Sequence, residues 1–557
     1  MRATFTEEPS AISPLSDADP TRTLIDDYLA EQQRLQTPVR RFSDAHDQQI
    51  FAERVEQWRD LIPLSRPAPG EQYAFEVDLD RCTGCKACVA GCHSLNGLED
   101  NETWRDIGQV LGGTRSHPFQ QTITTACHHC ADPACMNGCP VLAYEKDPVT
   151  GIVRHLDDQC IGCQYCVLKC PYDVPKYSER LGIVRKCDMC HSRLAEGEAP
   201  ACAQACPTQA IRIINVRVET PEGNLVERAN DFLESAPSPD YTKPTTRFVT
   251  RRHWPDNVEA VDAHALRPQH AHWPLVFMLT FLPMAVGCVV LANGLHGGDG
   301  SALAVTGVVA GAIGLFASVF HLGQPLRAWR VFLGLRRSWL SREAVIFGGW
   351  FGLAVAFATE RFVPAAWLGK LAAPVFLPVR IGMNFLRQHD NTLGASVASI
   401  GILGLFCSAM IYIDTRRPLW RATQTFPRFF GAGAVLGLVA TYALSPDFHY
   451  AIGAAIAMLF KLAVETRCLR VLDEEDESPS PERMTALVLT GPLRTWTSLR
   501  YLSAAAVIVM IAASLAFPFG GIMRWGIFSL ALLSEGVERS LFFRAVFAPK
   551  MPGVMSS

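Results

Sequence analysis

Sixteen of the nineteen cysteines lie between Cys82 and Cys206, and they fall into four groups of four. Thiolate sulfur is the usual protein ligand of iron–sulfur clusters and one of the ligands of structural zinc. The sequence therefore predicts four metal centres. The groups are Cys82, Cys85, Cys88 and Cys92; Cys127, Cys130, Cys135 and Cys139; Cys160, Cys163, Cys166 and Cys170; and Cys187, Cys190, Cys202 and Cys206.

The spacing within the groups favours iron–sulfur clusters. The first and third groups read CxxCxxCxxxC, and the second, third and fourth groups end in Cys-Pro. Three thiolates on a tight loop can bind three corners of a cubane, while the fourth, one helical turn later, reaches a partner cluster as in a two-cluster ferredoxin. Zinc sites instead use two separated pairs of ligands. Disulfides fit less well, because adjacent CxxC half-loops make poor bridges and the sequence shows no secretory signal.

Three segments carry a specific family resemblance. Residues 81–88 read RCTGCKAC, residues 160–166 read CIGCQYC, and residues 186–190 read KCDMC. They resemble the four-cluster iron–sulfur subunits of molybdopterin oxidoreductases such as dimethyl sulfoxide reductase, in which the first group pairs with the fourth and the second with the third. The third group keeps all its cysteines, which favours four [4Fe–4S] clusters. The resemblance implies these ligand sets: Cys82, Cys85, Cys88 and Cys206; Cys187, Cys190, Cys202 and Cys92; Cys127, Cys130, Cys135 and Cys170; and Cys160, Cys163, Cys166 and Cys139.

The remaining elements must position these cysteines, and a polar first half is followed by an apolar second half. The net charge of -3 gives no indication of nucleic-acid binding. We therefore expect no nucleic-acid partner. The composition predicts an N-terminal extension (1–70), an α+β ferredoxin-like domain with four clusters (71–216), a polar, proline-rich linker (217–268) and an all-α membrane domain (269–557).

Local patterns predict individual elements of the first half. Apolar and polar residues alternate over 73–80, 151–156 and 210–216, which predicts strands that lead to or leave the cysteine groups. Apolar residues at helical spacing predict helices over 23–35 and 47–62 in the extension. We expect the extension to clasp the cluster domain or a partner subunit.

Eight apolar stretches in the second half predict eight transmembrane helices, because most approach the ~20 residues that cross a bilayer. The loops after the second, fourth and sixth stretches carry fourteen Lys and Arg residues, against five in the other loops. The excess of basic residues predicts that both termini and the cluster domain are cytoplasmic, on the inner membrane. The stretches are 273–293, 302–322, 344–358, 393–413, 429–445, 448–465, 501–519 and 526–547.

Motifs in this half also resemble a known family. Residues 321–327 read HLGQPLR, residues 338–343 SWLSRE, residues 407–412 CSAMIY and residues 538–543 ERSLFF. They resemble the membrane-anchor subunit of dimethyl sulfoxide reductase, which binds menaquinol without haem. The resemblance implies that two subunits usually made separately are fused here. In the better-known enzyme the iron–sulfur and catalytic subunits are exported, whereas this sequence shows no export signal.

Ionisable residues inside a membrane indicate functional sites. His321 and Arg327 are suited to a quinol site, because an imidazole can exchange protons near neutral pH and a guanidinium can bind a quinone carbonyl. Lys461, Glu535 and Glu538 could form a proton route to it. Alternatively, Glu535 could pair with Arg539 four residues later and merely hold the bundle together. We expect no haem, since His321 alone lies convincingly within a predicted span.

These patterns predict a non-catalytic redox subunit that anchors an oxidoreductase complex to the membrane lipid. It would pass electrons from menaquinol through the clusters to a separate cytoplasmic molybdopterin subunit. Reversed flow, from a formate-dehydrogenase-like donor to quinone, is one alternative. A membrane redox sensor is another, although the sequence contains no recognisable output domain.

Overall fold

A computed structural model describes residues 23–34, 44, 60–218, 232–233, 235–295, 297–363, 377–473, 480–517 and 519–554. The chain forms two compact units, Met1–Asp60 and Leu61–Ser557. In the first unit, helix α1 (Leu24–Arg34) confirms the helix predicted over 23–35, and Thr23 and Asp26 cap its first turn. The helix predicted over 47–62 lies almost entirely outside the described residues.

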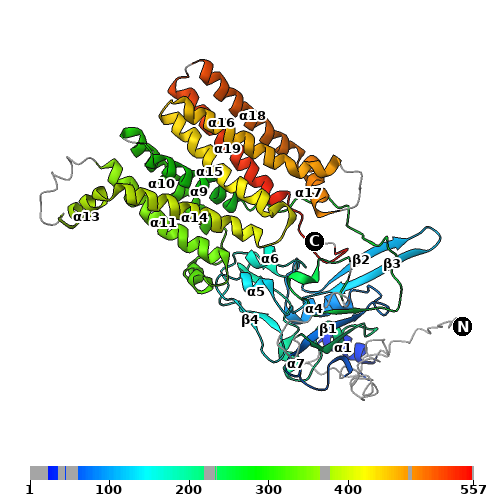
Figure 1. The fold of residues 1–557 in the computed structure, drawn as a ribbon. Helices are drawn as coiled ribbons and strands as arrows, with labels where there is room; N and C mark the ends of the chain where they lie inside the picture. The colour runs from blue at the N-terminus through cyan, green and yellow to red at the C-terminus, as the bar shows by residue number, and fades with distance from the viewer. Residues whose placement is uncertain are drawn as a thin grey trace. The chain divides into compact units, whose positions relative to one another are not determined.

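The cysteine-rich region of the second unit is built on small sheets (Figure 1). One sheet has the order β8-β1-β9, with β1 (Glu71–Asp78) antiparallel to β8 (Ile211–Arg217), and the other has the order β10-β2-β3. β1, β8 and β5 confirm the three predicted strands. The other strands are β2 (Asp106–Gly113), β3 (Pro118–Thr125), β4 (Tyr144–Lys146), β5 (Val153–His155), β6 (Lys176–Ser178) and β7 (Ile183–Arg185), and β4-β5 and β6-β7 form hairpins.

Each cysteine group leads into a short helix. The two CxxCxxC loops share one backbone conformation, with Gly84 and Gly162 at φ near 70° followed by Lys86 and Gln164 at φ near 60°. Glycine adopts such a positive φ at little cost, so the loops can turn tightly around three thiols. The helices are α4 (Ala87–Asn96), α5 (Ala134–Gly138), α6 (Tyr165–Lys169), α7 (His191–Ala195) and α8 (Ala201–Gln204).

The segment predicted as a linker contributes edge strands to both sheets. β9 (Arg247–Val249) pairs in parallel with β1, and β10 (Glu259–Ala260) pairs with β2. A short 3₁₀ helix, η3 (Pro239–Tyr241), precedes them. Short strands of this kind are added to an open sheet edge through backbone hydrogen bonds, which a polar, proline-rich composition does not reveal.

Each predicted apolar stretch overlaps a helix of 19 residues or more. Six of these helices are long and apolar enough to cross a membrane. The other two, α16 and α19, contain buried charged residues. The eight are α9 (Trp273–Asn293), α10 (Gly298–Val319), α11 (Trp339–Phe362), α14 (Asp390–Ile413), α15 (Ala422–Leu444), α16 (Phe448–Thr466), α18 (Arg494–Ala516) and α19 (Gly521–Arg544).

Shorter helices join the long ones within the described residues. η4 (Pro325–Gly334) follows α10, η6 (Pro418–Trp420) follows α14, and η7 (Arg467–Asp473) and α17 (Pro481–Thr490) lie between α16 and α18. Helix α13 (Leu377–Gln388) precedes α14. α9 lies at the centre of the bundle, and about two thirds of its most apolar 18-residue window is buried.

Several residues lie elsewhere than the sequence predicts, and three of them bear on the predicted site and topology. α10 ends at Val319, so His321 lies just beyond the helix and not within a span. The predicted loops include Arg428 and Arg500, but these residues lie in α15 and α18 and are buried. Removing these two from the fourteen leaves twelve basic residues against five, and the direction of the imbalance is unchanged.

Candidate functional site

The fold brings cysteines of different groups together in two small hollows. Cys206 lies with the first three cysteines of the first group, and Cys139 lies with the first three cysteines of the third group. Each hollow therefore presents four thiols, three from one loop and one from a group distant in the sequence. This is the crossed arrangement that the family resemblance implies.

The other two implied sets are also close in space. Burial, and next the thiol of Cys202, raises the pKa of Cys92 to about 12. Burial and the neighbouring thiols of Cys127, Cys170 and Cys135 raise the pKa of Cys130 well above its usual value. Thiols this deeply buried ionise readily only when a bound cation compensates the thiolate charge, as iron does in a cluster.

Backbone N–H groups point at several of these sulfur atoms. The amides of Ala143, Gly162 and Ala210 donate to the sulfur atoms of Cys139, Cys160 and Cys206 at 3.2 to 3.3 Å. Hydrogen bonds to cysteine sulfur stabilise thiolates and raise cluster reduction potentials. Four thiols in a set, a hollow between them and N–H donors to sulfur fit a [4Fe–4S] cluster.

His321 and Arg327 meet the loop of the third cysteine group. The His321 Nε2 lies 3.2 Å from the carbonyl oxygen of Cys163. The Arg327 Nη1 donates to the carbonyl oxygens of Asp157 and Cys160 at 3.0 and 3.2 Å. The guanidinium predicted to bind a quinone carbonyl is thus hydrogen-bonded to the loop of the third cysteine group.

The backbone between these two residues also fits closely against the cluster region. A Cβ atom at Gly323 would overlap the carbonyl of Gly182, so only glycine permits this approach. The Gln324 amide donates to the carbonyl oxygen of Ile161 at 3.0 Å, and its side chain donates to that of Leu181 at 2.8 Å. The HLGQPLR motif therefore docks the membrane domain onto the third cysteine group.

The cluster region and the membrane domain make further contacts that the sequence does not predict. Lys169 forms an ion pair with Asp414, at 2.6 Å, between α6 and the end of α14. The hydroxyl of Tyr165 donates to the carbonyl oxygen of Ile411 at 3.0 Å, and that of Ser338 to the carbonyl oxygen of Gly138 at 2.7 Å. Backbone carbonyls accept most of these bonds, and no side-chain motif marks such acceptors.

A second histidine, which the sequence does not indicate, lies beside His321. The rings of His272 and His321 meet edge-on with centroids 5.4 Å apart. Burial lowers the pKa of His321 to about 4 and that of His272 to about 3. Both rings are therefore neutral at pH 7, which differs from the near-neutral titration expected from the sequence.

Known proteins match both halves of the chain. Residues 119–216 match the 4Fe-4S dicluster domain, and residues 270–471 match the DMSO reductase anchor subunit (DmsC). The B subunit of anaerobic dimethyl sulfoxide reductase from Escherichia coli is 37% identical over 183 residues, which cover 31% of this chain and 86% of that protein. The corresponding B subunit of Haemophilus influenzae is 39% identical over 150 residues, or 25% of this chain and 73% of the relative.

The chain belongs to the family of anaerobic dimethyl sulfoxide reductase B subunits. It is a fusion, since a DmsC-type anchor domain follows the iron–sulfur domain in the same chain. A more distant relative is the Hydrogenase-2 operon protein HybA of Escherichia coli O157:H7, at 33% identity over 243 residues, or 39% of this chain and 72% of the relative. Together with the six apolar helices, these matches identify a multi-pass membrane protein with an iron–sulfur electron-transfer domain.

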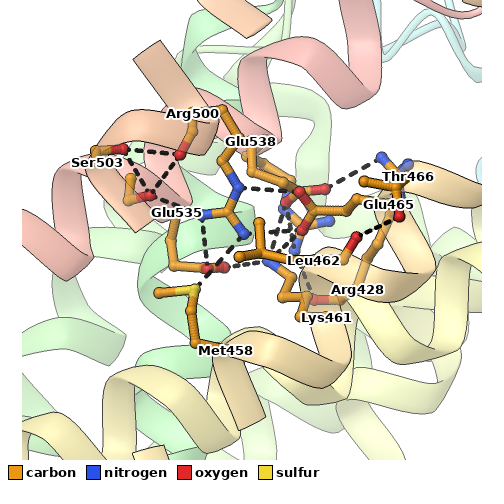
Figure 2. A network of polar contacts seen from close by, with 12 residues as sticks. Arg428, Met458, Lys461, Leu462, Glu465, Thr466, Arg500, Ser503, Glu535 and Glu538 are labelled. Carbon is orange, nitrogen blue, oxygen red and sulfur yellow. Dashed lines mark hydrogen bonds and ion pairs between the residues drawn. The ribbon is translucent and has the colours of Figure 1, made fainter. Parts of the chain in front are cut away.

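In the anchor domain of this dimethyl sulfoxide reductase-type fusion, the predicted intramembrane charges meet in one buried network (Figure 2). Lys461 pairs with Glu535 and lies 3.3 Å from Glu538. Glu535 also pairs with Arg500 at 3.1 Å, and Arg539 pairs with Glu538 instead of Glu535. The predicted pair between Glu535 and Arg539 is therefore wrong, because cations from neighbouring helices lie closer to Glu535.

The sequence predictions omit several members of this network and one further acid. Glu465 pairs with Arg500 at 2.8 Å, and Arg428 pairs with Glu538 at 3.2 Å. Glu343 is buried in α11. The cost of placing charges in a membrane would flag Arg428 and Arg500, but the sequence pattern places both in loops. Among the described residues, four cations and three carboxylates make up the network.

Proposed function

We propose that this chain carries electrons between the membrane quinone pool and a separate catalytic subunit. Its relatives are named as one subunit of a reductase, which supports a further, catalytic subunit in the complex. The membership in this family favours a molybdopterin subunit as that partner and menaquinol as the quinone. The chain itself would contribute the quinol half-reaction, and the partner would hold the site for the final substrate.

The sixteen cysteines would hold four [4Fe–4S] clusters in the crossed sets given above. The two hollows, the four thiols in each and the N–H donors to sulfur support this assignment. When bound, such clusters accept and release single electrons, which links a two-electron quinol to a two-electron site elsewhere.

The observation that carries the proposal is the contact between His321 and the carbonyl of Cys163. It joins the end of α10 directly to a loop whose thiols would ligate a cluster. A quinol bound beside His321 would therefore lie near the first electron acceptor. The neutral ring of His321 would accept a hydrogen bond from the quinol hydroxyl, and Arg327 would keep the acceptor loop in register.

We further propose that eight helices span the membrane and that the cluster domain faces the cytoplasm. α16 and α19 can span despite their charges, because each buried cation in the network has a carboxylate within 4.0 Å. The basic loops after α10 and α14 are also the loops that contact the cluster domain, through Arg327 and Arg417. The basic-residue excess thus supports a cytoplasmic cluster domain.

A proton route through Lys461, Glu535 and Glu538 stays a prediction. Their mutual ion pairs favour a role in holding α16, α18 and α19 together.

Variants of the purified chain in lipid vesicles test the quinol site. We expect His321→Ala to abolish reduction of the clusters by a menaquinol analogue, and Arg327→Ala to slow it strongly, with iron content unchanged in both. His389→Ala is the matched control, because His389 is an exposed histidine at the start of α14. Normal quinol-driven reduction in His321→Ala would place the site elsewhere.

Reversed flow is the second candidate, and the same contact would serve it. To distinguish the two directions, the rate at which pre-reduced clusters reduce menaquinone is compared with the rate at which oxidised clusters oxidise menaquinol. A faster menaquinone reduction would favour reversed flow. A sensor function would predict no quinol-dependent change in the clusters at all.

A further inference from the structure

Two buried cations lie among the cysteine sets, and neither forms an ion pair with a carboxylate in the described part of the chain. Arg105, directly before β2, is 1% exposed. Its Nη1 donates to the Thr124 hydroxyl at 3.2 Å, and that hydroxyl lies 3.5 Å from the sulfur of Cys88. Its guanidinium also lies 4.6 Å from the ring centroid of Phe75. Within the described part of the chain, its Nε and Nη2 have no hydrogen-bond partner.

Lys186 is the second buried cation, and it lies next to cysteines of the second and fourth groups. It is 3% exposed and follows β7. Its Nζ donates to the carbonyl oxygen of Cys187 at 2.8 Å, also reaches that of Val153, and lies 3.6 Å from the sulfur of Cys127. Cys187 and Cys127 belong to different implied sets, so this ammonium lies between two clusters.

Arg105 likewise lies between two sets. Besides Cys88, the thiols of Cys202, Cys187 and Cys92 are close enough to act electrostatically on the Arg105 guanidinium. Cys88 belongs to the set completed by Cys206, and the other three belong to the set of Cys187. The guanidinium is thus near sulfur atoms of both.

A buried cation without a counter-charge is strongly unfavourable. Among the described residues, no carboxylate forms an ion pair with Arg105 or Lys186. The anionic groups that act on them most strongly are cysteine thiols, and Asp188 acts on Lys186 less strongly than three thiols do. Four thiolates around an iron–sulfur cubane give the cluster a net negative charge, which grows when an electron is added. The missing counter-charge is therefore best supplied by the clusters themselves.

We propose that Arg105 and Lys186 are fixed positive charges that raise the reduction potentials of the clusters on either side of them. A nearby cation favours the reduced state, because the added electron increases the negative charge that it faces. Arg105 acts on the sets of Cys82 and Cys187, and Lys186 acts on the sets of Cys187 and Cys127. Both charges act on the cluster of Cys187. Its reduction potential should therefore be raised by each of them.

The inference rests on the cysteine sets of the proposed function but not on its quinol site. The test is therefore a redox titration of the purified full chain with dithionite and mediators, followed by paramagnetic resonance, with iron content measured in parallel. Absence of iron from the unmodified chain would contradict the cluster assignment. The effect of Arg105 and Lys186 is judged separately, from the midpoint potentials of the clusters.

We expect Arg105→Gln to lower the reduced-to-oxidised ratio of two clusters at least tenfold at a fixed potential, which is about 59 mV for a one-electron couple. Lys186→Met should lower the midpoints of the clusters of Cys187 and Cys127. The cluster of Cys187 should therefore shift in both variants. The cluster of Cys160 should shift in neither. Arg105→Lys and Lys186→Arg keep the charge and should restore the midpoints. Arg115→Gln, in the exposed β2-β3 turn, is the matched control.

Unchanged midpoints in both neutral variants would overturn the proposal. So would equal shifts in the neutral and charge-conserving variants, since these would show that side-chain shape is what matters. If Arg105→Gln assembles less iron, recovery of both iron and midpoints in Arg105→Lys would support a role of the charge. Failure of Arg105→Lys to recover them would count against it.

Discussion

Glu538 offers the sharpest test of the buried network. Among the described residues, Arg428 and Arg539 each have Glu538 as their one carboxylate partner, at 3.2 and 3.6 Å. Glu538→Gln therefore leaves two guanidinium groups, 4% and 1% exposed, without a counter-charge. Breaking a buried ion pair by removing one partner costs about 3–5 kcal/mol. We expect the free energy of unfolding to fall by at least this amount.

Two comparisons make the prediction specific. Lys461→Met also removes a charge from the network. In that variant Arg500 stays paired with Glu535 and Glu465, and Arg428 stays paired with Glu538. Its cost should therefore be smaller than that of Glu538→Gln. Glu482→Gln is the surface control, because Glu482 pairs with a largely exposed Arg421, and such pairs contribute about 0–1 kcal/mol.

The assay is unfolding of the purified chain in mixed micelles by increasing SDS, followed by tryptophan fluorescence. A loss of stability in Glu538→Gln no larger than that in Glu482→Gln would refute the reasoning. Equal losses in Glu538→Gln and Lys461→Met would refute the part of it that rests on stranded arginines.

Three further predictions concern the clusters and the topology. Anaerobically purified chain should contain about sixteen iron and sixteen sulfide ions, because four cubanes contain four of each; substantial zinc with little sulfide would contradict this. Cys206→Ser should alter the cluster of Cys82, and loss of the cluster of Cys187 alone would disprove the crossed pairing. A cysteine introduced at Gly298 should react with impermeant maleimide outside intact cells and one at Arg336 should not; the opposite result would reverse the topology.

Much of the architecture could be predicted from local patterns. The cysteine spacing indicates which thiols share a loop, and the strands before and after them follow from simple alternation. The eight apolar stretches coincide with eight long helices, since the length of an apolar run is a local property. The boundary after α10 was harder to predict, because apolar composition continues past Val319 although the helix ends there.

The contacts between distant segments could not be predicted in the same way. Arg327 binds backbone carbonyls of Asp157 and Cys160, and every residue offers such a carbonyl. Glu535 has a potential local partner in Arg539 four residues away, but Lys461 and Arg500 approach from α16 and α18. Local spacing rules describe one helix, whereas tertiary packing decides these pairs.

The central claim is that the membrane domain delivers quinol electrons to the cysteine-bound clusters without help from another subunit. It is tested most directly by adding a menaquinol analogue to the unmodified chain in anaerobic lipid vesicles and recording paramagnetic resonance. We predict that at least one cluster signal grows with the quinol, and that dithionite then reduces the remainder. Clusters that dithionite reduces but that no quinol changes, in the absence of a partner, would contradict the account.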